Sequence, residues 1–164
     1  MGSYGIHNIW VYNIFDVLFY PGIILLYSDV FGKSGLRWLI TTLTFGVLIW
    51  EILQLFLSDI SIFNTYFITI ISTIIIFLAL SYLVKLFLDT SITSPLKNDF
   101  YYWFSVGFVI YFVFNAVMLG MYTQIIESKV IWLPVFIFYS SHLITLVLHI
   151  FLWTGFRAAF IWMK

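Results

Sequence analysis

The run FNTYFITIISTIIIFLALSYLVKLFL, residues 63–88, decides the fold because it is almost wholly apolar and contains a single charged residue, Lys85. A membrane-spanning helix needs about 20 apolar residues, since each adds ~1.5 Å of rise and the hydrocarbon layer is ~30 Å thick. The apolar residues follow one another without the strict alternation of a lipid-facing barrel strand. The run therefore predicts a transmembrane α-helix.

The rest of the 164-residue chain has the same character. Hydrophobic residues make up 63% of it and charged residues only 9%, and the mean hydropathy is +1.10. A soluble domain of this length would need many more charges to cover its surface. The composition predicts an integral membrane protein whose outer surface contacts the lipid bilayer.

Five segments are long and apolar enough to span a membrane, at about residues 8–27, 36–57, 63–88, 101–123 and 130–156. The connections between them are short and rich in Gly, Ser, Asp, Asn and Pro, which are common loop residues. We therefore expect a single membrane domain, residues 1–164, folded as an all-α polytopic bundle of five transmembrane helices. Pro21 lies inside the first segment, where it should kink the helix or end it early.

The basic residues are distributed unequally over the two predicted sides of the membrane. The side with the first and third connections and the C-terminus has six of them, and the other side has only Lys129. The six are Lys33, Arg37, Lys85, Lys97, Arg157 and Lys164. Cytoplasmic loops carry an excess of Lys and Arg. We expect the N-terminus outside, the C-terminus in the cytoplasm, and a location in a bacterial cytoplasmic membrane.

Several classes of function lack the residues they require. The chain has no cysteine, which excludes disulfides, iron–sulfur clusters and thiolate metal sites. Its formal net charge is zero, and no basic patch indicates a nucleic-acid partner. Phosphate-binding loops and a GxSxG nucleophile motif are missing, so the sequence predicts no catalytic residue, no metal site and no cofactor.

Four titratable residues fall inside the predicted spans: Asp16, Glu51, His142 and His149. Such residues are costly in a membrane, so each is a functional-site hypothesis. By helical rise, Asp16 lies ~12 Å and Glu51 ~10 Å below the outer surface, on neighbouring antiparallel helices. Two close carboxyl groups would share one proton, an arrangement that suits proton coupling, cation binding or a structural hydrogen bond.

The amides Asn13, Gln54 and Asn115 can serve as further partners in the same intramembrane polar site. The two histidines are seven residues apart, so they share one helix face but are separated by ~10 Å along the axis. That separation is too large for one metal ion, whose bonds to His nitrogen are ~2 Å long. The expectation is a polar seam inside the bundle, in which each ring meets a hydroxyl, amide or carboxylate. A proton-relay role and a metal or haem role remain alternatives.

Residues 63–119 carry one resemblance to a known family. The run after the third segment includes Lys97, Asn98, Asp99, Phe100, Trp103, Gly107, Tyr111 and Phe112. This run resembles the multi-pass membrane domains that head certain bacterial sensor histidine kinases. It departs from their pattern in the position of Pro95, in two tyrosines before Trp103, and in the lack of a following kinase domain. The resemblance implies a membrane sensing or docking unit and supplies no site residue.

Two main hypotheses follow. The first is a non-enzymatic membrane module, a sensor-like or accessory subunit whose partners are other membrane protein subunits or further copies of the chain. The second is a small oligomeric transporter or ion-conducting protein that uses Asp16 and Glu51. A membrane haem or redox protein is a third, with less support.

Overall fold

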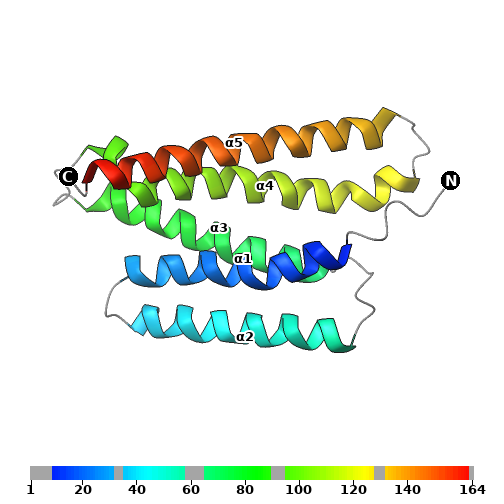
Figure 1. The fold of residues 1–164 in the computed structure, drawn as a ribbon, viewed down its shortest axis with the longest axis horizontal. Coiled ribbons are helices and arrows are strands. Elements are labelled where there is room, and N and C mark those ends of the chain that lie inside the picture. Colours follow the sequence, from blue (N-terminus) through cyan, green and yellow to red (C-terminus); the bar gives the residue numbers. More distant parts are fainter. Residues whose placement is uncertain (1–8, 32–34, 58–64, 90–94, 128–131, 163–164) are drawn as a thin grey trace. The chain divides into compact units, whose positions relative to one another are not determined.

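A computed structural model describes residues 9–31, 35–57, 65–89, 95–127 and 132–162, and these ranges are helical apart from short ends and connections. Five α-helices follow one another, with one short 3₁₀ helix before the fourth (Figure 1). They are α1 (Ile9–Val30), α2 (Gly35–Leu57), α3 (Thr65–Leu88), η1 (Leu96–Asn98), α4 (Phe100–Glu127) and α5 (Trp132–Trp162). The all-α prediction is confirmed, and each predicted segment corresponds to one helix.

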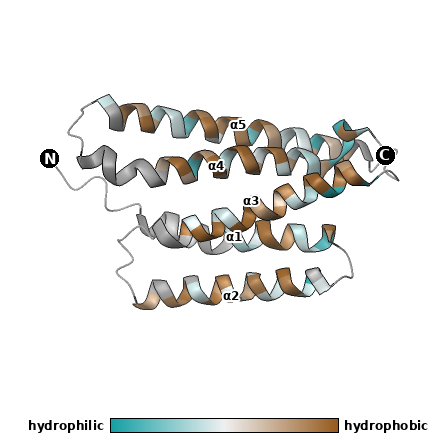
Figure 2. Cartoon of the chain, turned by 180° about the vertical axis from the view of Figure 1, so that it is seen from behind, coloured by the Kyte–Doolittle hydropathy of each residue, from teal (hydrophilic) through white to brown (hydrophobic). Residues whose placement is uncertain are grey.

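Three helices contain spans that are long and apolar enough to cross a membrane, namely Ile68–Leu88, Phe100–Met118 and Val135–Phe160. The described parts of α1 and α2 contain shorter apolar stretches, Phe19–Val30 and Arg37–Trp50. In the coloured parts of the helices, Figure 2 shows many apolar residues, drawn in brown, with few hydrophilic ones between them. The fold is that of a helical membrane protein.

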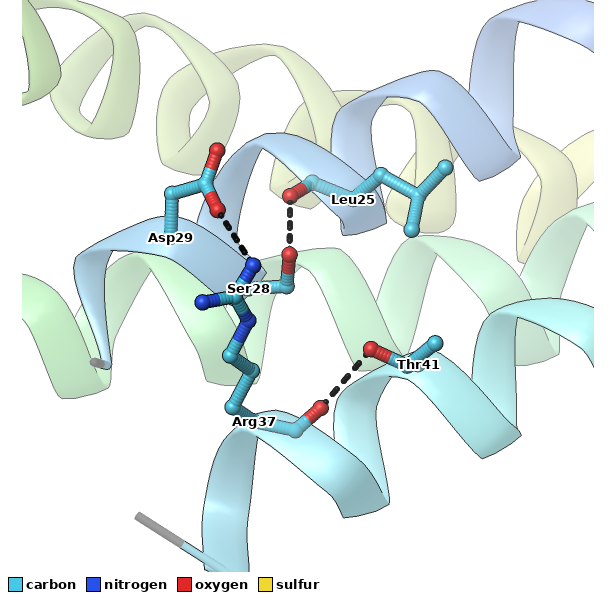
Figure 3. A network of polar contacts seen from close by, with 5 residues as sticks. All are labelled: Leu25, Ser28, Asp29, Arg37 and Thr41. Carbon is cyan, nitrogen blue, oxygen red and sulfur yellow. Dashed lines mark hydrogen bonds and ion pairs between the residues drawn. The ribbon is translucent and has the colours of Figure 1, made fainter. Parts of the chain in front are cut away.

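The chain divides into two compact units, Met1–Ile71 and Ser72–Lys164. In the first unit α1 and α2 pack against each other. Where α1 ends and α2 begins, the Arg37 guanidinium lies 3.2 Å from the Asp29 carboxylate (Figure 3). Both side chains are at least half exposed, so this ion pair contributes little to stability. It lies at the polar end of the α1–α2 pair.

Helix α1 continues without interruption through Pro21, which lies inside its Ile9–Val30 range. The expectation that the helix ends early and resumes is therefore wrong. Proline removes only one backbone donor, and the hydrogen bonds on either side of it can hold the helix together.

Several serine and threonine hydroxyls are satisfied by the backbone of their own helix, whereas the buried Ser72 hydroxyl of α3 has no hydrogen-bond partner in the part of the chain that the structure describes. The Ser28 hydroxyl donates to the Leu25 carbonyl at 2.7 Å, and the Thr44 hydroxyl donates to the Ile40 carbonyl at 2.8 Å. Such bonds need no second helix and no water, so a hydroxyl can face an apolar environment without an unpaired donor. Thr41 and Thr154 behave in the same way.

In the second unit, α4 and α5 approach closely at two glycines. A Cβ atom added to Gly107 of α4 would lie 2.7 Å from the Cβ of Phe151, and one added to Gly155 of α5 would lie 2.6 Å from the Phe104 ring. Glycine at such points lets two helix backbones come together.

Helix α3 carries the most extensive buried face of the three spanning helices. Within the second unit its buried side chains recur every three or four residues, which is the spacing of one helix face. They are Ser72, Ile75, Leu78, Ala79, Tyr82 and Leu86. By contrast, only 6% of the residues in the 18-residue apolar window of α5 are buried, and the other residues of that window are half-buried or exposed.

Candidate functional site

The structure describes the side chains of three of the seven predicted site residues: Asn115, His142 and His149. The other four have helical backbones but side chains outside the described residues: Asn13 and Asp16 of α1, Glu51 and Gln54 of α2. The prediction that the two acids face the protein interior therefore stays a prediction. The candidate site that can be built is the histidine-bearing face of α5.

Both histidines use one ring nitrogen to bind their own helix. The Nδ1 atom of His142 lies 2.7 Å from the Phe138 carbonyl oxygen, and the Nδ1 atom of His149 lies 2.7 Å from the Thr145 carbonyl oxygen. In each pair the carbonyl is four residues earlier, one helical turn away. The His142 ring also contacts the Phe138 ring at a centroid distance of 4.2 Å. Both rings are thus fixed in orientation by the turn that precedes them.

These bonds determine which ring nitrogen carries hydrogen. A carbonyl oxygen can only accept, so Nδ1 must be the donor in both residues. In a neutral imidazole the other nitrogen, Nε2, is then an acceptor with a free lone pair. Neither Nε2 atom has a hydrogen-bond partner within the part of the chain that the structure describes. Each histidine therefore presents one unused acceptor to its surroundings.

The described contacts of both histidines are with their own helix, and the predicted seam inside the bundle stays a prediction. The sequence favoured a seam inside the bundle with hydroxyl, amide or carboxylate partners, but His142 and His149 are both exposed on α5 and bind backbone carbonyls. The reason is geometric, because the carbonyl one turn earlier is within reach of Nδ1 in any helix. The seven-residue spacing predicts that His142 and His149 share one face of the helix, and both are exposed.

Asn115 is half-buried on α4, and its amide nitrogen donates to the Tyr111 carbonyl of the same helix at 3.1 Å. The contacts of Gly107 with Phe151 and of Gly155 with Phe104 show that α4 and α5 run antiparallel. At that register and ~1.5 Å per residue, Asn115 lies about level with His142 along the helix pair. The described contacts do not join Asn115 to either histidine.

Comparison with protein-family models, curated proteins and solved structures finds no match. Function must accordingly be inferred from the chain itself. Among the described residues, no group of three His, Asp or Glu side chains could hold a metal ion.

One polar cluster was not predicted as a unit, and it lies where α3 ends and α4 begins. The Tyr82 hydroxyl donates to Oδ2 of Asp99 at 2.6 Å, and Oδ1 of Asp99 accepts the backbone N–H of Tyr102 at 3.0 Å. Asp99 directly precedes α4, so the second bond is an N-cap. The Trp103 indole N–H donates to the Lys97 carbonyl at 2.9 Å and holds η1 against the helix.

The cluster of Tyr82, Asp99 and Trp103 joins α3 to the start of α4 through side chains. An Asp before the aromatic run of α4 is a recognisable capping signal, but its partner Tyr82 is 17 residues away and cannot be read from spacing. We assign this cluster a structural role, because both Asp99 carboxylate oxygens and the Trp103 indole N–H already form hydrogen bonds. Among the described residues, unused polar capacity remains at the two histidines of α5 and at the buried Ser72 hydroxyl of α3.

Proposed function

We propose that the chain is a non-enzymatic integral membrane module that acts as a sensor-like or accessory subunit, with α5 as its contact face. The observation that carries this proposal is that α5 has few buried residues in its apolar span and bears two exposed imidazoles there. A helix that faced only lipid would gain nothing from such groups, because an unpaired acceptor in hydrocarbon is costly. A neighbouring protein helix can satisfy it.

The membrane topology forms part of the proposal. The five helices each cross the bilayer once, with the N-terminus outside and the C-terminus in the cytoplasm of a bacterial cell. The second unit supports this orientation, because Lys85, Lys97 and Arg157 lie at the same end of it. Tyr82, one turn before Lys85, binds Asp99, and η1, which contains Lys97, contacts α5. A concentration of basic residues at one end is typical of the cytoplasmic side.

The hydrogen bonds of three polar side chains in the described helices favour a module over a conducting protein. The side chains of Ser28, Thr44 and Asn115 bind carbonyls of their own helices. A conduction path requires groups that converge from several helices and stay free to exchange an ion or a proton. The resemblance of residues 63–119 to sensor membrane domains favours the same choice, and the cluster around Asp99 falls within that stretch.

Site-specific photo-crosslinking in native membranes tests the proposal. A benzophenone amino acid replaces Leu146 of α5, which is 57% exposed and lies between the two histidines. The matched control places the probe at Val113 of α4, which is 44% exposed among apolar neighbours. We expect protein adducts from position 146 and mainly lipid adducts from position 113. Lipid adducts alone at position 146 would contradict a contact role for α5.

Reconstitution separates the module from a transporter. Purified chain in liposomes should give no proton or cation flux above that of empty liposomes. Flux that is lost in Asp16→Asn and Glu51→Gln variants would replace the proposal with the conducting function. An absorbance spectrum of the same sample tests for haem, since a Soret band would indicate a redox protein.

A further inference from the structure

Two cations lie where α4 begins and α5 approaches its end. The two helices are close there, because a Cβ atom added to Gly155 of α5 would lie 3.2 Å from the Phe100 carbonyl oxygen of α4. Lys97 precedes Phe100 by three residues in the chain. Arg157 follows Gly155 by two residues. Both cations therefore belong to one end of the helix pair.

The Trp103 side chain fixes the backbone of Lys97 beside α5. Its indole N–H donates to the Lys97 carbonyl at 2.9 Å, and its ring centroid lies 6.0 Å from that of Phe151. The short helix η1, which contains Lys97, also contacts α5. Each of these contacts lies within the second unit, Ser72–Lys164. The nearness of Lys97 to α5 therefore does not depend on the first unit.

Both cations are exposed and lack a countercharge. Neither the Lys97 ammonium nor the Arg157 guanidinium has a hydrogen-bond or ion-pair partner in the part of the chain that the structure describes. Two of the described acidic side chains are engaged elsewhere. Asp29 pairs with Arg37, and both carboxylate oxygens of Asp99 accept hydrogen bonds at the start of α4. Lys97 and Arg157 are thus free to bind an anion from outside the chain.

Lys85 lies at the same end of the second unit but has a different setting. Asp89 follows it by four residues, and the Asp89 backbone N–H still donates to the Lys85 carbonyl as in a helical turn. Opposite charges at this spacing attract each other. The charge of Lys85 is thus offset within α3, and we assign it no part in anion binding.

The level of Arg157 along α5 is that of the lipid head groups. The apolar span Val135–Phe160 has 26 residues, or ~39 Å at ~1.5 Å each, which exceeds the ~30 Å of hydrocarbon. Arg157 lies in the last turn of this span. Trp153, one turn earlier on the same face, is 73% exposed, and exposed tryptophans are typical of the membrane–water interface. Beyond such a tryptophan, an arginine reaches the phosphate groups of the lipid.

We propose that Lys97 and Arg157 bind the phosphate groups of anionic phospholipids at the membrane surface. Charge complementarity carries the inference, since two cations without a countercharge meet the most abundant anions at that level. Ammonium and guanidinium groups donate charge-assisted hydrogen bonds to phosphate oxygens. Each such residue near an anionic membrane surface raises affinity about five-fold. The inference requires the second unit to lie in a bilayer and is independent of any protein partner of α5.

Lipid binding to the purified chain in detergent micelles, followed by native mass spectrometry, tests this assignment. The probes are phosphatidylglycerol, which is anionic, and phosphatidylcholine with the same acyl chains, which has no net charge. The natural chain should bind phosphatidylglycerol about 10- to 30-fold more tightly. Lys97→Gln and Arg157→Gln should each weaken that binding about five-fold and leave phosphatidylcholine binding unchanged.

Two control variants show whether charge at this place is responsible. Arg37→Gln removes a cation that already has Asp29 as its partner, so it should change phosphatidylglycerol binding by less than about two-fold. Lys97→Arg keeps the charge and should keep the affinity. Circular dichroism of each variant verifies the helical fold.

Equal affinity of the natural chain for the two lipids would overturn the inference, as would equal losses in Arg37→Gln and in the two test variants. Excess inorganic phosphate should not displace phosphatidylglycerol, and complete displacement would indicate a site for soluble phosphate instead. These outcomes are distinguishable from a failure of the proposed function, because crosslinking of α5 to a neighbouring protein is measured at Leu146, away from this end.

Discussion

Alanine at Gly107 should separate α4 from α5. The added methyl group would lie 2.7 Å from the Cβ of Phe151 and 3.4 Å from a methyl carbon of Leu148. The first contact cannot be relieved by a rotamer change, because a Cβ atom moves only with its backbone. Overpacking of this kind costs about 1–3 kcal/mol. Alanine regains roughly 0.5–1 kcal/mol through its higher helix propensity, so the expected net loss is about 0–2.5 kcal/mol relative to the natural chain and about 1–3 kcal/mol relative to a glycine-to-alanine control without a clash.

The control is Gly46→Ala in α2, where an added Cβ would meet no atom within 4 Å. Only the propensity gain applies there, so this variant should be as stable as the natural chain or up to about 1 kcal/mol more stable. Unfolding of both variants is followed by circular dichroism in mixed detergent micelles with increasing SDS. The close approach of α4 and α5 would be refuted if Gly107→Ala were as stable as Gly46→Ala.

Three further outcomes follow from the described contacts. Tyr82→Phe should lower the free energy of unfolding by about 0.5–1.5 kcal/mol in the same assay, because it removes one hydrogen bond. Asp99→Ala should lower it by roughly 1 kcal/mol more, because it also removes the N-cap of α4. Equal losses in the two variants would refute the capping role of Asp99. Arg37→Ala should change the free energy of unfolding by less than about 1 kcal/mol, since its partner Asp29 is exposed. A larger loss would contradict the exposed position of this ion pair. Nitrogen-15 NMR of labelled His149 should report a protonated Nδ1 in the membrane, and a protonated Nε2 with a bare Nδ1 would contradict its bond to the Thr145 carbonyl.

The positions of the helices could be predicted because they depend on local composition. A run such as residues 63–88 has no option in lipid except a helix, since every backbone N–H and C=O must be paired within the segment. Helix α5, Trp132–Trp162, extends beyond the predicted apolar span of about 130–156, because Arg157 and the two alanines after it have good helix propensity.

The partners of polar side chains could be predicted only in part. A shared face for His142 and His149 follows from their spacing, but no pattern in the sequence indicates that both rings bind the preceding turn. The link between Tyr82 and Asp99 depends on how α3 packs beside α4, and the close contact of Gly155 depends on the register of α5 against α4. Such tertiary contacts have no periodic signal in a single sequence.

The membrane topology is the central claim, because the depth of every polar group and the direction of α5 depend on it. Tags on the two termini, probed with a membrane-impermeant reagent in intact and in permeabilised cells, measure it most directly. The account predicts that the N-terminal tag is labelled in intact cells and the C-terminal tag only after permeabilisation. Labelling of both tags, or of neither, in intact cells would place the termini on one side of the membrane and contradict five crossings.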